Sequence, residues 1–101
     1  MAKRLAFTVM PMEYEWDEAK NRANILKHKV SFGRAALILK GPIYTKVDLR
    51  QDYGETRFVS IGIVEDECLV VVHTIRGEKL RIISAWKGGQ DERNKLSQLY
   101  S

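Results

Sequence analysis

Apolar residues recur at two different spacings along the chain, which predicts helices in its first part and strands in its second part. Asp17 favours the N-cap of a helix and Glu18 suits its first turn, so we expect a helix from there to about Lys29. One side of this helix is expected to be buried and the other exposed. The apolar side holds Ala19, Ala23 and Leu26 with Ile25 beside them, and the polar side holds Lys20, Asn21, Asn24 and Lys27.

Shorter elements are expected on both sides of this helix. Before it, Tyr14 and Trp16 alternate with acidic residues, as in a short half-buried strand. After it, Ser31 is a second N-cap candidate, for a short helix that stops at Gly41 and Pro42. The apolar stripe of that second helix consists of Phe32, Ala35, Ala36 and Leu39.

After Pro42 the pattern changes to runs of β-branched and aromatic residues separated by charged turns. The expected strands cover residues 43–49, 56–64, 68–75 and 79–85, and a last helix covers residues 90–99. Residues 65–67 form the charged tip of a hairpin, and residues 50–55 form a loop. The order of a strand, two helices, a meander of strands and one helix predicts an α+β fold with a mostly antiparallel sheet.

Composition narrows the class of protein. The chain has 101 residues, of which 45% are hydrophobic, and this fits one domain with its own core and excludes a disordered chain. No apolar run approaches the roughly 18 residues that a membrane span needs, so we expect a soluble protein with no membrane partner. Cys68 is the single cysteine, which excludes an internal disulfide and favours a cytoplasmic location.

The first eleven residues differ from the remainder. Lys3 and Arg4 precede a short apolar stretch that ends at Pro11, but no small-residue cleavage site follows, so a signal peptide is not expected. We interpret residues 1–11 as an N-terminal extension or an extra edge strand, and residues 12–101 as the functional domain. The alternative is that Met12 is the true start.

The net charge near +4 is distributed in patches. Residues 52–67 contain five acidic residues and one basic residue, whereas residues 68–101 contain six basic and three acidic residues. An excess of this size is common in proteins that bind nothing charged, so the placement of the cations matters more than their number.

The sequence offers no familiar metal or cofactor motif. It contains no phosphate loop, dinucleotide fingerprint or zinc-protease helix. Cys68 and His73 lie five residues apart on one expected strand, and this odd offset directs them to opposite faces of the sheet, so they cannot hold one ion. We therefore expect no metal and no cofactor, and we interpret Cys68 as a core residue because its neighbours are apolar.

Cationic and hydrogen-bonding residues gather on the meander, with Tyr53 and Glu55 just before it. They are Arg57, His73, Arg76, Lys79, Arg81 and Lys87. Lys79 and Arg81 would share one face of a strand, which is either a phosphate-binding face or an ordinary solvated one. A three-residue connection between the last two strands would place His73 opposite Arg81, whereas a two- or four-residue connection would place Val72 there; the sequence leaves both open.

Three blocks of sequence, in order, cover most of the chain. The first is WDEAKNRAN at residues 16–24 with KHKVSF at residues 27–32, the second is DYGE at residues 52–55 with Arg57 and Ile61–Gly62, and the third is RGE at residues 76–78 with RIISA at residues 81–85. Together, from about Tyr14 to Arg93, they resemble the motifs of BrnT-type ribonuclease toxins. Two positions depart from that pattern: Trp86 stands where the family usually has a basic residue, and Leu96 stands where an aromatic is expected, with Tyr100 further on.

The resemblance implies the toxin of a type II toxin-antitoxin pair, with a compact fold similar to the RelE group, which cleaves RNA without metal and so inhibits translation. It also implies a BrnA-like antitoxin, a ribbon-helix-helix DNA-binding protein that covers the toxin in a hetero-oligomer. A catalytically silent binding module of the same fold, which only pairs with an antitoxin or with nucleic acid, is the alternative function.

RNA cleavage by attack of a 2′ hydroxyl needs a base, an acid and cations that stabilise the extra negative charge. We expect Arg57 and Arg81 to supply the charge, because guanidinium groups hold phosphate oxygens at two points. Glu55 or His73 would be the base or acid, although His73 could instead satisfy a hydrogen bond inside the sheet. The expected RNA-binding residues are Lys79, Arg76, Lys87, Lys27 and His28, of which His28 could alternatively cap its helix or align the site.

Overall fold

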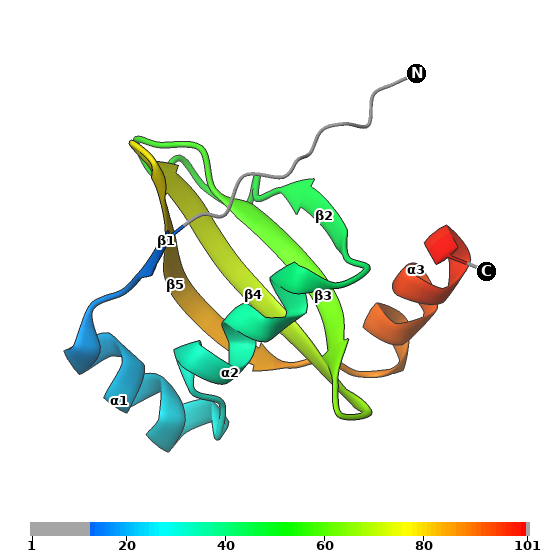
Figure 1. The fold of residues 1–101 in the computed structure, drawn as a ribbon. Helices are drawn as coiled ribbons and strands as arrows, with labels where there is room; N and C mark the ends of the chain where they lie inside the picture. The colour runs from blue at the N-terminus through cyan, green and yellow to red at the C-terminus, as the bar shows by residue number, and fades with distance from the viewer. Residues whose placement is uncertain (1–12, 101) are drawn as a thin grey trace.

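The computed structural model describes residues 13–100, which form a five-stranded sheet with helices around it (Figure 1). The expected N-terminal extension and the alternative start at Met12 lie outside these residues. The elements in chain order are β1 Glu13–Glu15, α1 Glu18–His28, α2 Phe32–Ala36, the 3-10 helix η2 Leu37–Lys40, β2 Tyr44–Val47, β3 Phe58–Val64, β4 Glu67–Arg76, β5 Lys79–Lys87 and α3 Gln90–Tyr100. This confirms the α+β class and the order of the predicted elements.

The sheet is mixed, with strand order β1-β5-β4-β3-β2. β2, β3, β4 and β5 pair antiparallel along the meander, as predicted, but β1 pairs parallel with β5. Three of the four strand pairs are antiparallel, as expected, and the parallel pair makes the sheet a mixed one. Because β1 covers only Lys79 to Arg81 of β5, the helix that follows it, α1, lies beside the remaining edge of that strand (Figure 1).

The turns of the meander determine which residues share a face of the sheet. Gly77 has a φ of 62° in a two-residue turn, so Arg76 pairs with Lys79 and Thr74 pairs with Arg81. The sequence left His73 and Val72 as the residues that could lie opposite Arg81, and neither is right, because Thr74 is opposite Arg81. His73 pairs with Ile82, and a β-bulge shifts the register between Val72 and His73.

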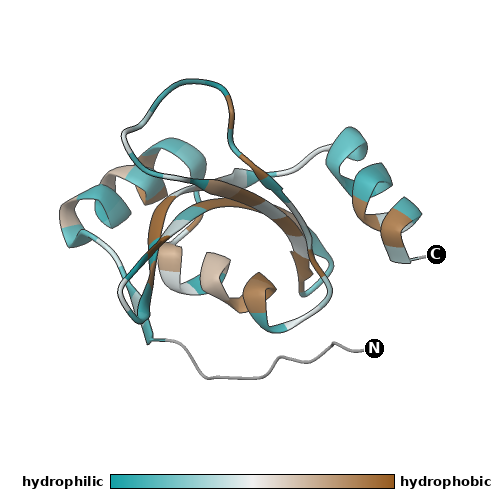
Figure 2. Cartoon of the chain, turned by 90° about the horizontal axis from the view of Figure 1, so that it is seen from above, coloured by the Kyte–Doolittle hydropathy of each residue, from teal (hydrophilic) through white to brown (hydrophobic). Residues whose placement is uncertain are grey.

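α2 and η2 cover one face of the sheet, which we call the helix face. Phe32, Ala35 and Ile38 pack there against strand residues such as Leu69 and Val71, and all five are at most 1% exposed. Figure 2 shows the strands curving around the brown stretch of α2 and η2, whereas α1 and α3 are mostly teal. The main core therefore lies between the sheet and this short helical segment.

α1 corrects the helical pattern expected from the sequence. Ala19, Ala23 and Leu26 are exposed, and Asn21 and Asn24 are each only 8% exposed. The reason is that both side chains bond to backbone groups that lack other partners: Asn24 pairs with Ala85 at the edge of β5, and Asn21 accepts from the N–H of Phe32 at the start of α2. Amide side chains can satisfy such groups, whereas apolar ones cannot.

The helix starts follow the sequence closely. The Asp17 carboxylate accepts a hydrogen bond from the backbone N–H of Lys20 at 3.1 Å, and the Ser31 hydroxyl accepts one from that of Arg34 at 3.0 Å. Both N-caps are therefore confirmed. Among residues 13–100, no helix is both long enough and apolar enough to cross a membrane.

Candidate functional site

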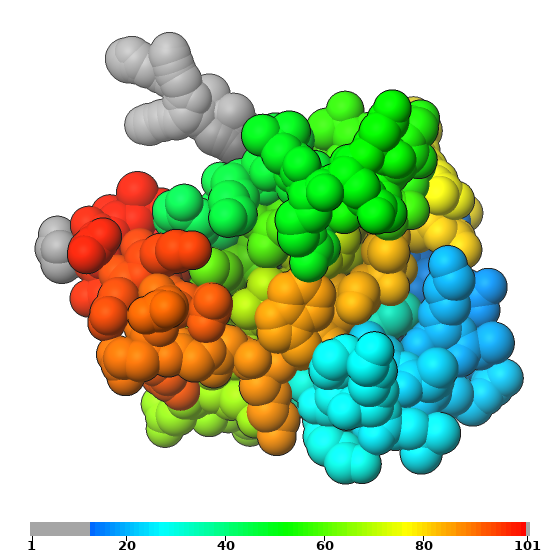
Figure 3. All heavy atoms as spheres, turned by 180° about the vertical axis from the view of Figure 1, so that it is seen from behind, coloured from blue at the N-terminus to red at the C-terminus, as the bar shows by residue number. Residues whose placement is uncertain are grey.

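The face of the sheet opposite α2, which we call the open face, presents a second apolar cluster. It contains Val59, Ile61, Cys68, Val70 and Val72, with Tyr44, Ile83, Trp86 and Leu96 packed against it. Figure 3 views the molecule from this side, where the chain after β2 (green), the end of β5 (light orange) and α3 (orange to red) surround the face. Of the helices within residues 13–100, α3 covers part of this face, and the five cluster residues are 1–8% exposed beneath the side chains that pack on them.

α3 is held against the open face at its far end. Leu96 packs on the apolar cluster, and the Tyr100 hydroxyl donates to the carbonyl of Ile43 at 2.7 Å and accepts from its N–H at 3.2 Å. Leu96 is the position in this helix at which the chain departs from the BrnT motifs, and Tyr100 is the aromatic further on. Both serve to anchor α3.

A charged group lies at one end of the open face, which we call the arginine cluster: Glu55, Arg57, Arg76, Lys79 and Arg81. Glu55 lies between two guanidinium groups, 3.1 Å from Nε of Arg57 and 3.4 Å from Nη2 of Arg76. The hydrogen bond from Arg57, more than any other contact, holds the pKa of Glu55 below its usual value. The Arg57 guanidinium also stacks over the ring of Tyr53, with Cζ 4.2 Å from its centroid.

The next strand supplies the other two cations of the cluster. On β5, Lys79 lies opposite Arg76 of β4 and Arg81 lies opposite Thr74. The side chains of Lys79 and Arg81 form ion pairs with carboxylates of β1. The Arg81–Glu15 pair measures 3.4 Å and the Lys79–Glu13 pair 3.8 Å. The parallel β1–β5 register places these partners side by side.

His73 lies on the helix face, away from the arginine cluster. Its Nε2 is 2.8 Å from the Ser60 hydroxyl, which in turn is 2.7 Å from that of Thr45, and its ring stacks on Phe58. Burial lowers the pKa of His73 to about 4, so the ring is neutral near pH 7. Its placement matches the structural alternative considered from the sequence, a hydrogen bond inside the sheet.

Three other predicted RNA-binding residues also lie apart from the arginine cluster. Lys87 is 3.2 Å from Glu67, which also pairs with Arg34 of α2. Lys27 is exposed in the last turn of α1. His28, in the same turn, faces Trp86 with ring centroids 6.3 Å apart.

Cys68 is buried in the apolar cluster of the open face, on the side opposite to His73, as predicted. Burial raises the pKa of its thiol, which makes it a poorer nucleophile. Within residues 13–100, no three His, Cys, Asp or Glu side chains come together as a metal site.

Sequence reasoning missed the buried carboxylate of Asp48, just after β2. Its side chain is 1% exposed and accepts hydrogen bonds from Nε of Arg50 at 2.8 Å, from Nη2 of Arg50 at 2.7 Å and from the Tyr53 hydroxyl at 3.0 Å. The hydrogen bond from the Arg50 side chain is the main reason why the pKa of Asp48 is far below its usual range. The one signal in the sequence for this ion pair was that Asp48 and Arg50 lie two residues apart at the end of the strand expected over residues 43–49.

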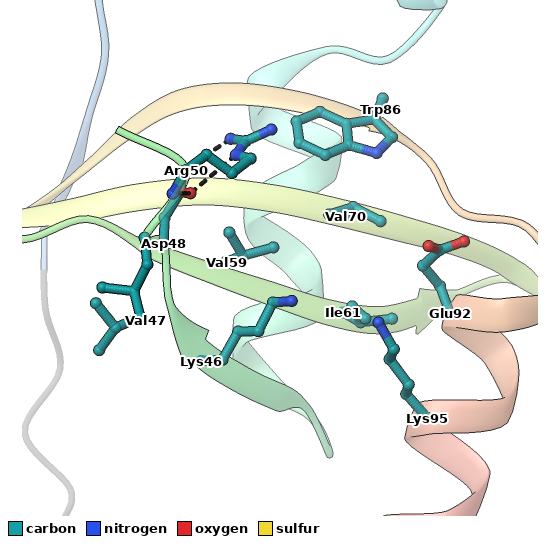
Figure 4. A pocket seen from close by; sticks show the side chains of 11 residues that line it. Lys46, Val47, Asp48, Arg50, Val59, Ile61, Val70, Trp86, Glu92 and Lys95 are labelled. Carbon is teal, nitrogen blue, oxygen red and sulfur yellow. Dashed lines mark hydrogen bonds and ion pairs between the residues drawn. The ribbon is translucent and has the colours of Figure 1, made fainter. Parts of the chain in front are cut away.

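Beside this ion pair, the open face contains a cavity of about 420 Å³ (Figure 4). Its floor is made of Val59, Ile61 and Val70, and Trp86 and Arg50 line one end. The Arg50 guanidinium lies over the Trp86 ring, 5.7 Å from its centroid. The other walls carry Lys46 of β2 with Glu92 and Lys95 of α3.

Comparisons with known proteins identify the family and a similar fold. The family model for "Ribonuclease toxin, BrnT, of type II toxin-antitoxin system" matches residues 16–92. The crystal structure of the Brucella abortus ribonuclease toxin BrnT is similar, with a TM-score of 0.59 and 26% sequence identity over 79% of this chain and 100% of that one. No curated protein sequence matches. On the strength of the family match over most of its length, this chain belongs to the BrnT family of ribonuclease toxins of type II toxin-antitoxin systems.

Proposed function

We propose that this protein is a metal-independent endoribonuclease toxin whose catalytic groups are those of the arginine cluster. The observation that carries the proposal is the position of Glu55 between Arg57 and Arg76, with Arg81 on the neighbouring strand. A carboxylate and several guanidinium groups on one accessible face are what an attack of the 2′ hydroxyl on the adjacent phosphate requires.

Arg57 and Arg81 stabilise the extra negative charge of the transition state, and Arg76 and Lys79 bind the flanking phosphates. In the free protein these cations pair with carboxylates that are themselves partly exposed. The Lys79–Glu13 pair is exposed, and exposed ion pairs contribute only about 0–1 kcal/mol, so a phosphate can replace Glu13 at little cost. The side chains of the Arg57–Glu55 and Arg81–Glu15 pairs are about a quarter exposed, so a phosphate that replaces these carboxylates must supply the hydrogen bonds that are lost. A guanidinium is suited to this exchange, because its planar fork fits phosphate and carboxylate alike.

Glu55 is the proposed base. Its carboxylate is ionised near pH 7, as a carboxylate ordinarily is, and can accept the proton of the 2′ hydroxyl and return it to the 5′ oxygen as that oxygen leaves. The guanidinium groups of Arg57 and Arg76 lower the pKa of Glu55, which makes it a weaker base until a phosphate draws them away. His73, the other candidate, is buried on the helix face beside Ser60 and has no route to the same phosphate. The proposal therefore assigns His73 to the packing of the sheet.

The wider function follows from the family. We propose that RNA cleavage inhibits translation in the cytoplasm, that the fold is related to that of the RelE ribonucleases, and that a BrnA-like antitoxin neutralises the toxin. A ribbon-helix-helix antitoxin that covers the open face would block access to the arginine cluster. The neutralised form would then be a hetero-oligomer. Residues 12–101 would suffice as the toxin domain.

The test is cleavage of end-labelled RNA by the purified protein in excess chelator. We expect Arg57→Ala and Arg81→Ala each to lower the rate by about a hundredfold to a thousandfold, the usual effect of removing one transition-state donor. Arg22→Ala is the matched control, because Arg22 is an exposed arginine on α1 whose one ion pair among residues 13–100 is with Glu18 in the same helix. Full activity of both cluster variants would refute the assigned site, and loss of all activity in chelator would refute metal independence.

A catalytically silent binding module is the second candidate. It is favoured by the ion pairing of the arginine cluster, since all four of its cations already have a carboxylate within 4 Å. An unmodified protein that folds and binds an antitoxin yet leaves RNA whole would decide for this alternative.

A further inference from the structure

We propose that the cavity beside Trp86 binds an RNA base, which stacks on the indole ring while the neighbouring phosphate reaches the arginine cluster. This inference rests on the proposed ribonuclease function and adds a binding subsite to it. In this proposal Trp86 helps to orient the RNA substrate. It stands where the BrnT motifs usually have a basic residue.

The cavity has the size and lining that a base requires. Its volume of about 420 Å³ is within the range of roughly 300–1,000 Å³ of small-ligand sites. Three buried aliphatic side chains form an apolar floor and the half-buried Trp86 stands at one end, as Figure 4 shows. Apolar and aromatic surfaces of this kind bind the flat face of any base by stacking.

Charge favours a nucleotide over an apolar peptide. Lys46 and Lys95 point into the cavity from β2 and α3 (Figure 4), and neither forms an ion pair with any residue between 13 and 100. Glu92 lies near them, and its carboxylate already accepts a hydrogen bond from the N–H of Gly89 at 2.7 Å. The two lysines can therefore contact the phosphate that accompanies the base, which an aliphatic peptide would not provide.

A continuous series of contacts joins this cavity to the arginine cluster. Arg50 stacks over Trp86 and pairs with Asp48, which accepts from the Tyr53 hydroxyl. The Tyr53 ring lies under Arg57. The loop between β2 and β3 thus contacts Trp86 through Arg50 at one end and carries the proposed catalytic residue Arg57 at the other. A single RNA strand that follows this loop would meet both.

Binding can be tested separately from cleavage with a short single-stranded DNA oligonucleotide, which lacks the 2′ hydroxyl and cannot react. In a Trp16→Phe variant, Trp86 is the only tryptophan, and Trp16 packs against Phe32 near the main core, remote from the cavity lining. We expect the oligonucleotide to quench the fluorescence of this variant, with the same dissociation constant that anisotropy of a labelled oligonucleotide gives. Binding by anisotropy without quenching, or no binding at all, would overturn the proposal.

Two substitutions of Trp86 distinguish stacking from simple filling of space. Trp86→Leu should weaken oligonucleotide binding and raise the KM for RNA by roughly 5- to 150-fold, the usual effect of one lost base stack, whereas Trp86→Phe should retain most of the affinity. Circular dichroism checks that both variants fold. The double variant Lys46→Ala and Lys95→Ala, which changes only exposed side chains, should make the salt dependence of binding shallower.

The outcomes separate the two proposals. If the parent protein binds and quenches but does not cleave RNA, the subsite stands and the ribonuclease function fails. If the parent cleaves RNA and Trp86→Leu has an unchanged KM and affinity, the ribonuclease function stands and the subsite is refuted. An antitoxin that binds the parent but not Trp86→Leu, when the oligonucleotide binds both equally, would assign the cavity to a protein partner and overturn the proposal.

Discussion

The side chain of Asn24 pairs with the backbone of Ala85 as a neighbouring strand would. Its Nδ2 donates to the carbonyl of Ala85 at 2.8 Å and to that of Val30 at 2.9 Å, and its Oδ1 accepts from the N–H of Ala85 at 3.3 Å. One amide thus satisfies both backbone groups of Ala85 at the point where β1 no longer covers the edge of β5. It also joins two segments that are 61 positions apart in the sequence.

Asn24→Leu should therefore destabilise the protein although it adds an apolar residue to a helix. It would leave three buried backbone groups without partners, and each such group costs about 1–3 kcal/mol, less where water can enter. We expect the free energy of unfolding in urea to fall by about 2–4 kcal/mol. Leu26→Asn, on the exposed side of the same helix, is the control and should change stability by less than about 1 kcal/mol. Equal effects of the two substitutions would contradict the assigned role of Asn24.

Gly62 is required by the close approach of η2 to β3. A Cβ atom at this position would lie 2.7 Å from Cβ of Ile38 in η2 and 3.3 Å from Cγ2 of Ile43. Gly62→Ala should lower the free energy of unfolding by about 1–3 kcal/mol, the usual cost of overpacking a core. Gly41→Ala is the matched control, because a Cβ there meets nothing within 4 Å and its φ is −124°. Similar denaturation midpoints for both variants would show that η2 moves freely.

Local signals in the sequence predicted local structure well. The N-caps Asp17 and Ser31 act within three residues of themselves, so their helices could be placed without knowledge of the rest. The buried side of α1 could not be predicted, because it depends on the unpaired edge of β5 and on the start of α2. Hydrophobic periodicity assumes that a helix packs against apolar side chains, and Asn21 and Asn24 pack against backbone instead.

The candidate site was predictable in part for the same reason. Glu55 and Arg57 are neighbours in the chain, and Arg76 and Arg81 flank one turn, so proximity along the sequence suggested their proximity in space. The side of the sheet on which His73 lies depends on the length of that turn, which the sequence left open. The cavity beside Trp86 draws its walls from β2, the loop after it, β5 and α3, and no single segment carries a signal for it.

His73 should make the stability of the protein depend on pH between about 6.5 and 4. Its pKa is lowered by burial from 6.5 to about 4 in the folded state, so between these values the unfolded chain binds a proton that the folded protein does not. Stability is therefore greatest above pH 6.5 and falls as the pH falls. At pH 5 the loss should be about 1–2 kcal/mol relative to pH 7.

The measurement is urea denaturation of the parent and of His73→Gln at pH 7 and pH 5. Glutamine retains a hydrogen-bonding group for Ser60 but does not titrate. The difference between the two pH values should be smaller in His73→Gln by the amount expected for His73. An equal difference in both proteins would place the source of the pH dependence elsewhere.

Asp48 should also make stability fall as the pH falls, but at lower pH than His73. Its pKa is lowered in the folded state, mainly by Arg50, so it contributes stability that is fully present above the ordinary carboxyl pKa, near 4, and is lost as the pH falls further. Asp48→Asn removes this contribution and weakens the hold on Arg50 and Tyr53. We expect a loss of about 2 kcal/mol at pH 7, the order of a charge-assisted hydrogen bond, and a smaller loss at pH 3.

The same substitution should also affect the site, because Asp48 orients Arg50 toward Trp86 and Tyr53 under Arg57. We expect Asp48→Asn to lower kcat/KM for RNA cleavage by about tenfold or more, since misplaced catalytic groups are costly even at distances near 1 Å. Asp52→Asn is the control, because in the part of the chain that the structure describes the Asp52 carboxylate accepts one hydrogen bond, from the N–H of Gly54 at 2.9 Å within the same exposed loop. If both variants cleave RNA as fast as the parent, the loop between β2 and β3 does not position the catalytic arginine.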